Sequence, residues 1–243
     1  MLNIESVYKN FLDLVNEEHN KGYVGFEGWF RASSAGQCYR KQFYELSGAE
    51  KDQIDSRPQR VMRLGTIVHE DIGCAITTGY INTEKSYVDL EERIEIPDLR
   101  IVGHPDIVQI ENDIAYLYDI KTMHSFAWKR RFGHAKNRDP KPSRNYELQL
   151  GTYAIGVRIK YDISKINAYI MWYKKDDSSI KINPIDVEKW MRRAELYWEE
   201  LIEMTSELTI EDLVPGQMIG VPFQNWECRY CSYKGTCPGG KKR

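Results

Sequence analysis

The middle of the chain narrows the possible folds most, because it contains three strand-like runs joined by short links. Residues 85–96 and 100–110 alternate apolar and polar positions, and residues 115–123 form a third run after a turn-prone segment at 111–113. Alternation with a period of two is typical of strands that bury one face. Short links between consecutive runs favour an antiparallel meander, so the sequence predicts a β-sheet at the centre of the fold.

Helical patterns precede and follow these strands. Apolar residues recur every three to four positions in most of them, which is typical of helices packed on a core. Helices are expected at residues 3–20, 33–46, 61–78 and 145–159, and from an Asn183-Pro184 start to about Leu208. Strands at 166–173 and 180–182 complete the pattern. This order is typical of an α/β or α+β fold with one mixed sheet flanked by helices.

Composition places the chain among ordinary globular proteins. Its 243 residues include 42% hydrophobic and 29% charged residues, with a formal net charge of −2. Such a chain can bury a sizeable core and is long enough for one large domain or two small ones; of these we expect a single domain over residues 1–243. No run reaches the roughly 18 apolar residues of a membrane span, and the acidic N-terminal segment is unlike a signal peptide. We therefore expect a cytoplasmic protein without a membrane partner.

Two acidic motifs on neighbouring predicted strands carry a strong chemical signal. Asp106 ends the Gly-His-Pro-Asp motif at 103–106, and Asp119 begins an Asp-Ile-Lys motif that ends at Lys121. A turn near residue 112 would place the two carboxylates side by side, and the two-residue period would put Asp119 and Lys121 on one face. Close carboxylates favour Mg²⁺ or Mn²⁺, and a lysine beside them can orient water or stabilise phosphate charge. An isolated Asp-x-Lys triplet is more often an ion pair on a solvated strand edge.

Three cysteines near the C-terminus have the spacing of metal ligands. Cys228, Cys231 and Cys237 form C-x2-C-x5-C, a cluster that is hard to explain as core filler. A site with four thiolates needs one more ligand, and the candidates are Cys38 and Cys74. The spacing fits either zinc or an iron–sulfur cluster.

Together these elements resemble the PD-(D/E)xK nucleases of the RecB type, in particular the CRISPR-associated and phage RecB-like exonucleases that hold a 4Fe-4S cluster. The shared features are a cysteine before the core, a histidine on a helix, Gly-x-x-Asp, Asp-x-Lys, a Gln-x-x-x-Tyr helix and the terminal cysteine motif, in this order over residues 33–238. The resemblance implies a restriction-endonuclease-like core with a mixed central sheet. It also implies a Mg²⁺- or Mn²⁺-dependent exonuclease that acts on single-stranded DNA with 5′ to 3′ polarity, beside an integrase or recombination partner.

The resemblance assigns roles to residues of the predicted nuclease core. The implied metal ligands are His69, Asp106, Asp119 and the backbone carbonyl of Ile120, and the implied catalytic lysine is Lys121. His69 lies on the helix predicted at residues 61–78. Gln149 and Tyr153 match the Gln-x-x-x-Tyr pair, and their spacing puts both on one helix face, where they contact DNA or support the site.

The resemblance also divides the chain around a cluster. The implied 4Fe-4S ligands are Cys38, Cys228, Cys231 and Cys237. Cys74 is then left as a buried small apolar residue. Residues 1–60 and 209–243 would form a cluster-binding subdomain, and residues 61–208 the nuclease core.

A basic segment follows the Asp-x-Lys strand and is the candidate DNA-binding loop. Residues 128–144 contain seven basic residues against Asp139 alone, so the local balance is +6 although the chain as a whole is nearly neutral. The basic residues are Lys129, Arg130, Arg131, Lys136, Arg138, Lys141 and Arg144. We expect a phosphate-binding loop in which Trp128 and Phe132 stack on bases, with a solvated charge run as the alternative.

Two other functions fit the same motifs. One is a nuclease-fold protein that works mainly as a DNA-binding or adaptation partner of an integrase or of a phage recombination system, with little cleavage of its own. The other is a nucleic-acid-binding module stapled by zinc.

Overall fold

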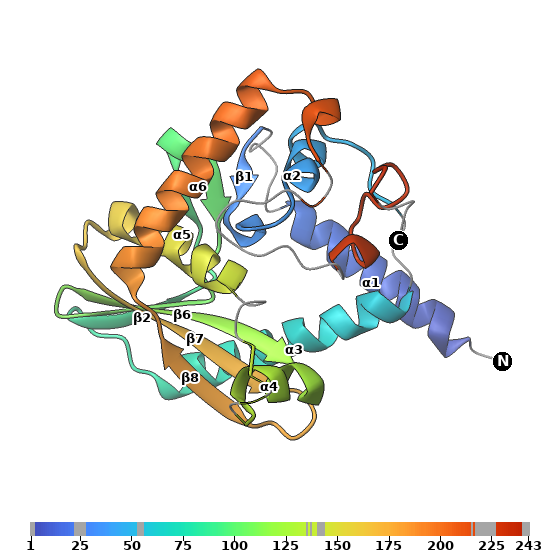
Figure 1. The fold of residues 1–243 in the computed structure, drawn as a ribbon. Coiled ribbons are helices and arrows are strands. Elements are labelled where there is room, and N and C mark those ends of the chain that lie inside the picture. Colours follow the sequence, from blue (N-terminus) through green and yellow to red (C-terminus); the bar gives the residue numbers. More distant parts are fainter. Residues whose placement is uncertain are drawn as a thin grey trace.

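A five-stranded mixed sheet is the larger of two sheets in this computed structural model (Figure 1). The structure describes residues 3–21, 28–52, 56–134, 136, 138–139, 144–214, 216 and 227–239. The strand order of the large sheet is β2-β5-β6-β7-β8. Its strands are β2 Ser86–Leu90, β5 Ile107–Glu111, β6 Ile114–Met123, β7 Lys165–Lys174 and β8 Ile180–Pro184.

Strand β6 lies at the centre of this sheet. It pairs antiparallel with β5 and, along its whole length, parallel with β7. The pairing with β5 stops at Ile107, opposite Tyr118, so the last part of β6 extends beyond its neighbour. This overhang leaves backbone groups of β6 available to the residue just before β5, and the site described below is built there.

A smaller sheet has the order β1-β4-β3, with strands β1 Phe30–Arg31, β3 Ile94–Ile96 and β4 Ile101–Gly103. The runs predicted at 85–96 and 100–110 are each divided between the two sheets, so the prediction of a single sheet is wrong. The chain turns within the first run at Glu91, which has a left-handed backbone (φ 50°). It turns within the second near Pro105, which has no N–H to donate to a ladder.

The helices cover both faces of the large sheet. Among the described residues the α-helices are α1 Ile4–Lys21, α2 Tyr39–Leu46, α3 Ser56–Gly79, α4 Ser125–Phe132, α5 Arg144–Tyr161 and α6 Val187–Glu207. Helices α5 and α6 lie over one face, and α3 runs along the other (Figure 1). Mixed sheets flanked by helices confirm the predicted mixture of helices and strands. No helix in the described ranges has the length and apolar character needed to cross a bilayer.

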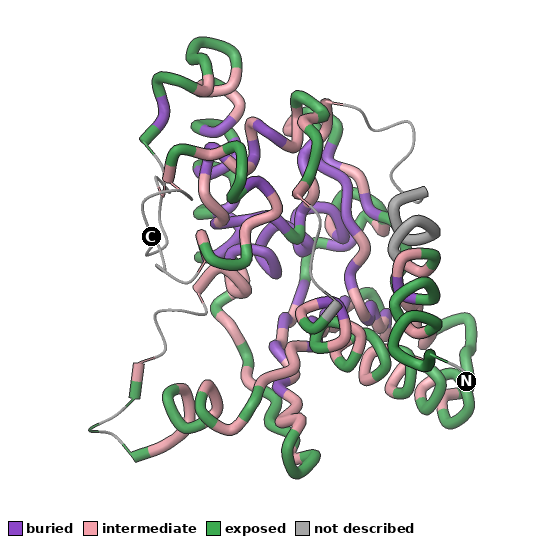
Figure 2. The backbone as a smooth tube through the Cα atoms, turned by 90° about the vertical axis from the view of Figure 1, so that its right-hand side faces the viewer, coloured by how far each residue is buried: buried purple, intermediate pink, exposed green. Residues whose placement is uncertain are grey.

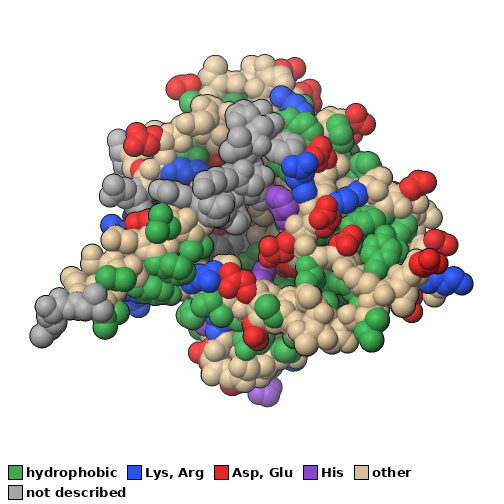
Figure 3. Space-filling view, turned by 180° about the vertical axis from the view of Figure 1, so that it is seen from behind, with side chains coloured by type: hydrophobic (Ala, Val, Ile, Leu, Met, Phe, Trp, Pro, Cys, Tyr) green, Lys and Arg blue, Asp and Glu red, His purple; other side chains and the backbone are tan. Residues whose placement is uncertain are grey.

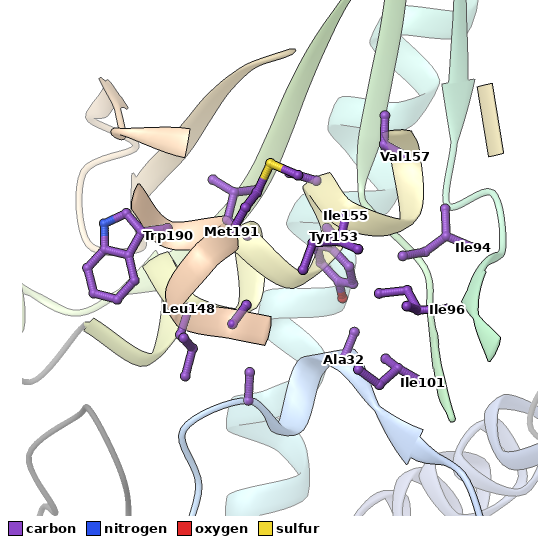
Figure 4. Close-up of a cluster of buried hydrophobic side chains, with 14 of the residues drawn as sticks. Ala32, Ile94, Ile96, Ile101, Leu148, Tyr153, Ile155, Val157, Trp190 and Met191 are labelled. Carbon is purple, nitrogen blue, oxygen red and sulfur yellow. The ribbon is translucent and has the colours of Figure 1, made fainter. Parts of the chain in front are cut away.

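The buried core lies between α5, α6 and the sheets (Figure 2). Figure 4 shows Tyr153 of α5 pointing toward Ala32 and Ile96, so α5 packs against the small sheet as well as the large one. Helices α5 and α6 approach closely at Gly151, where an added Cβ would lie 2.4 Å from the Trp190 carbonyl oxygen. Because Ala32 belongs to the same buried cluster as the strands of the core, the segment just before α2 is packed into that core.

Helices α2 and α3 begin at residues other than those predicted. Helix α2 begins at Tyr39 rather than Ser33, because residues 32–34 form a 3-10 turn in which Ser34 Oγ donates to the Arg31 carbonyl (2.7 Å). Helix α3 begins at Ser56, five residues before the predicted start at residue 61.

The last long helix also starts later than predicted. Helix α6 begins at Val187 and is capped by Asp186, whose Oδ1 accepts a hydrogen bond from the Lys189 N–H (3.2 Å). Asn183 and Pro184, predicted as its cap and first turn, lie at the end of the edge strand β8. A proline is tolerated there because an edge strand can lack a ladder donor.

The N-terminal helix is less buried than its apolar pattern predicts. Ile4, Val7, Phe11 and Leu14 are all exposed, whereas Leu12 is buried. Figure 3 shows hydrophobic side chains gathered over this projecting part of the molecule. The three-to-four spacing therefore predicts the helix correctly but not the burial of its apolar face.

Candidate active site

The two acidic motifs meet where β6 extends beyond β5. Asp106 directly precedes β5, and its Oδ2 accepts a hydrogen bond from the backbone N–H of Ile120 (2.5 Å). At this point the β5 backbone has ended, so a carboxylate takes the place of a ladder carbonyl. Strand register, rather than a long loop, therefore fixes Asp106 next to the Asp-x-Lys motif.

Asp119 and Lys121 point to the same face of β6, as the two-residue period predicts. Lys121 Nζ lies 2.8 Å from Asp119 Oδ1 and 2.7 Å from Oδ2. Asp119 has no solvent-exposed surface, so this ion pair is buried under α5 rather than exposed on a strand edge. Burial raises the pKa of Asp119 to about 6, against the opposing effect of Lys121. The pKa of Lys121 is raised, since the two nearby carboxylates outweigh the effect of burial.

His69 reaches the same site from α3. Its Nδ1 lies 3.4 Å from Asp106 Oδ1, and the side chain is about one-quarter exposed. Burial lowers the pKa of His69, but the Asp106 carboxylate outweighs it, so the pKa is raised overall. The structure thus brings an imidazole, two carboxylates and an ammonium from three elements to one end of the large sheet.

Helix α5, which covers this face of the sheet, contributes the Gln-x-x-x-Tyr pair. Gln149 Nε2 lies 3.3 Å from Asp119 Oδ1 and 3.0 Å from the Tyr153 hydroxyl. Both side chains are buried, and Tyr153 packs against Gly103, where an added Cβ would lie 2.8 Å from Tyr153 Cε1. Of the two predicted roles, this burial favours support of Asp119 over direct contact with DNA.

Tyr146 is a further member of the site that the motif did not reveal. Lys121 Nζ lies 5.2 Å from the centre of its ring, on the side of the sheet covered by α5. Burial raises the pKa of Tyr146, so its phenol remains neutral beside the ammonium. A signal was present in the sequence, because Tyr146 precedes Gln149 by three residues and so shares its helix face.

The side chains around Asp119 are chemically suited to a divalent cation. One imidazole and two carboxylates, with the Ile120 carbonyl nearby in sequence, are the donors that Mg²⁺ and Mn²⁺ take. As the side chains stand, however, no group of three or more His, Cys, Asp or Glu residues in the described part of the chain is close enough to hold an ion. The Lys121 ammonium contacts both Asp119 carboxylate oxygens and supplies the positive charge that a cation would bring there.

The four predicted cluster ligands line one cavity of about 250 Å³. These residues are Cys38, Cys228, Cys231 and Cys237. None of these four described cysteines forms a disulfide. Burial raises the pKa of Cys231, and the neighbouring thiols of Cys38 and Cys237 act in the same direction. Thiolates are the ligands of zinc and of iron–sulfur clusters, but as the described side chains stand, no three of these thiols are close enough to hold one ion.

Cys74 lies apart from this cavity. It is exposed on α3, so it neither lines the space between the four thiols nor fills the core. The expectation that Cys74 is a buried apolar residue is therefore wrong. Helix α3 presents this position to solvent, although its neighbours in sequence are apolar.

The basic segment is only partly a loop. Lys129, Arg130 and Arg131 belong to α4, and Arg144 is the first residue of α5. Arg131 is mostly buried over the ring of Trp172, at 4.1 Å from its centre. Lys136 and Arg138 are exposed, and Lys141 lies outside the described residues.

The aromatic residues of this segment also differ from expectation. Trp128 and Phe132 pack against the core, with ring centres 4.7 Å apart. In this arrangement their rings stabilise α4 on the sheet instead of facing solvent as base-stacking surfaces.

The large mixed sheet thus carries two carboxylates and a lysine at one end, with a helix histidine beside Asp106. The sequence matches the PD-(D/E)XK nuclease superfamily over residues 77–238, and the protein belongs to this superfamily. The mixed sheets and flanking helices agree with the core of that fold.

Two solved structures are similar to this chain. The crystal structure of SSO0001 has 19% identity and a TM-score of 0.53, with 95% of this chain and 96% of that chain covered. At this identity the likeness extends to the fold alone. A candidate exonuclease from Eubacterium rectale has 12% identity and a TM-score of 0.47, with 85% of this chain and 96% of that chain covered. No curated protein sequence matches the chain.

Proposed function

We propose that this protein is a metal-dependent deoxyribonuclease that hydrolyses phosphodiester bonds as an exonuclease on single-stranded DNA, with 5′ to 3′ polarity. The observation that carries the proposal is the buried contact between Asp119 and Lys121, two residues apart on β6, with Asp106 and His69 beside it. Burying an ion pair is costly, and structural stability alone rarely requires it. Because the protein belongs to the nuclease superfamily, a role in phosphodiester hydrolysis would explain this costly pair.

The residues of the site have distinct roles in this proposal. His69, Asp106, Asp119 and the carbonyl of Ile120 would hold Mg²⁺ or Mn²⁺, which would polarise the phosphate and lower the pKa of bound water. Lys121, freed from Asp119 by the added positive charge, would donate to a phosphate oxygen or orient the attacking water. Gln149 would keep the Asp119 carboxylate in place through its hydrogen bond to Oδ1.

Three parts of this proposal rest on the motif resemblance to RecB-like nucleases and to their CRISPR-associated and phage relatives. These parts are the DNA substrate, the exonuclease mode and the RecB-like subtype. Exposed cations on and after α4 support a nucleic-acid substrate, because the segment follows the Asp-x-Lys strand directly. Lys129, Lys136 and Arg138 are the described candidates for phosphate contacts. An integrase or recombination protein is the proposed partner.

The second part of the proposal is a 4Fe-4S cluster held by Cys38, Cys228, Cys231 and Cys237. Its support is the common cavity that these four thiols line. Such a cluster would tie the residues before α2 to the C-terminal segment. We propose that its role is structural, because phosphodiester hydrolysis moves no electrons.

Cleavage of single strands tests the proposed activity. Purified protein with Mn²⁺ or Mg²⁺ should degrade a strand with free ends and spare one whose ends are blocked, and labels at either end report the polarity. Lys121→Ala should lower the rate by about 100- to 1,000-fold. Lys165→Ala, a control at the far end of β7, should leave it unchanged. Equal rates for wild type and Lys121→Ala would reject the catalytic assignment and favour a DNA-binding role.

Metal analysis tests the cluster independently of cleavage. Protein purified without oxygen should contain about four iron atoms per chain and absorb visible light. A colourless protein with one zinc per chain would replace the cluster with a zinc staple.

A further inference from the structure

We propose that a cavity between α4 and the C-terminal cysteine segment is a base-stacking subsite, which holds one unpaired nucleobase of the DNA strand beside Lys121. The inference rests on the proposed function and adds the residues that recognise the single strand. The cavity has a volume of about 480 Å³ and is lined by Met123, Phe126, Arg130, Tyr146, Trp172 and Tyr230, among others. Ligand-binding cavities fall in the range of about 300–1,000 Å³.

The cavity is lined by neighbours of the proposed catalytic lysine. Met123 lies two residues beyond Lys121 on β6 and shares its face of the sheet, while Trp172 of β7 is the register partner of Lys121. Tyr146 completes this end, and the ring that lines the cavity is the one above Lys121 Nζ. A group bound here therefore lies next to the proposed reaction centre.

Two exposed aromatic rings form the outer walls. Phe126 is 66% exposed, and its ring lies 6.2 Å from that of His124 in a stacked orientation. Tyr230 is 70% exposed and lines the same cavity from the C-terminal segment. Large aromatic residues exposed together at a cavity are uncommon on a protein surface that binds nothing. A nucleobase is a flat π-surface that stacks on such rings without regard to sequence.

The position of the cavity favours a base from a single strand over one from a duplex. Bases within a duplex are already stacked and paired, and they must be unstacked before a protein ring can cover their faces. An unpaired strand meets no such cost, so a stacking wall next to the reaction centre would select single strands. Arg130, whose guanidinium pairs with Asp139 at 2.7 Å, adds a cation at the rim of the cavity.

The subsite also gives the cluster a role in substrate binding. Tyr230 lies between Cys228 and Cys231, both of which line the cysteine cavity. Tyr146 and Tyr230 line both cavities, so the two spaces adjoin. A cluster bound to these cysteines would hold the Tyr230 wall in place opposite Phe126.

An abasic scan tests the subsite without requiring cleavage. Affinity for single-stranded oligodeoxynucleotides is measured in an Asp119→Asn background, with one abasic position moved along the strand. One abasic position should weaken binding by about 10-fold, the loss expected for one stacked base. Phe126→Ala should weaken binding of the intact strand by a similar factor. In this variant an abasic position should cause no further loss of affinity. Phe126→Tyr keeps the ring and should bind both strands as the parent protein does.

Controls separate the subsite from the rest of the proposal. Leu196→Ala, equally exposed at 66% on α6 but not lining the cavity, should leave both affinities unchanged. Tyr230→Ala should mimic Phe126→Ala at unchanged iron content. If Phe126→Ala binds the intact strand as tightly as its parent, or if the abasic loss persists in it, the subsite is refuted even when wild type cleaves DNA. Absence of cleavage with a positive scan would instead refute only the proposed nuclease activity.

Discussion

The proposed catalytic cluster at the end of β6 and the cysteine cavity are assembled in opposite ways. Asp106, Asp119 and Lys121 lie within 16 residues of sequence, and strand register with a partly buried hydrogen bond fixes them. The four thiols come from residue 38 and residues 228–237, which lie on segments joined by side-chain contacts such as the stacking of Tyr44 on Tyr233 (5.0 Å). The first site is formed by the fold itself, whereas we propose that the second gains its rigidity from a bound cluster.

Replacing Asp119 should give the largest functional effect. Asp119→Asn keeps the shape of the side chain and removes the buried negative charge, so cleavage should fall to background while the circular dichroism spectrum stays the same. Mn²⁺ should raise the melting temperature of wild type but not of this variant, because a ligand stabilises only the state that binds it. Asp113→Asn, in the exposed turn at the other end of β6, is the control. A metal-induced shift that survives in Asp119→Asn would place the metal elsewhere.

Replacing one cavity thiol should disturb the other region and leave the sheet folded. Cys231→Ser should lose iron and visible absorption and lower the melting temperature by about 10 °C, which corresponds to roughly 3 kcal/mol in a chain of this size. Cys74→Ser, at the exposed thiol on α3, should change neither. Iron bound equally by both variants would contradict the proposed ligand set.

Local patterns in the sequence were enough to predict the catalytic edge of the sheet. A period of two and a short turn place Asp119 and Lys121 on one face next to Asp106, and the structure has this arrangement. The helix stripe through Trp190, Met191 and Trp198 is likewise buried as its spacing predicts. These predictions succeed because each depends on neighbours within a few residues.

Predictions that depend on distant contacts were less successful. The division into two sheets follows from β1, which pairs with β4 some 70 residues later. The exposure of Phe126 and the burial of Trp128 depend on how α4 packs on β7 and β8, which helix periodicity does not specify. The cysteine motif predicts ligands by spacing, but only the folded chain shows that Tyr230 lines the neighbouring cavity.

Crowding at Gly103 should transmit a packing change to the catalytic edge. A methyl group there would lie 2.7 Å from Ala32 Cβ and 2.8 Å from Tyr153 Cε1, and Tyr153 shares a hydrogen bond with Gln149. Gly103→Ala should cost about 1–3 kcal/mol of stability and lower the cleavage rate with little change in substrate affinity. Gly79→Ala is the control, since an added Cβ there meets nothing within 4 Å. Wild-type stability in Gly103→Ala would show that Tyr153 can move freely.

Substitution of Gln149 should give the smallest effect and separates support of Asp119 from contact with DNA. Its bond to Asp119 Oδ1 is long, at 3.3 Å, so Gln149→Ala should lower the cleavage rate by about 10-fold, the low end for a bond to a charged group. Gln149→Glu would place a second carboxylate beside Asp119, whose pKa burial already raises to about 6. Repulsion would raise that pKa further, so the rise of activity with pH should move to higher pH. A loss of DNA affinity at an unchanged pH profile would instead mean that Gln149 contacts the substrate, and the catalytic edge would then extend onto α5.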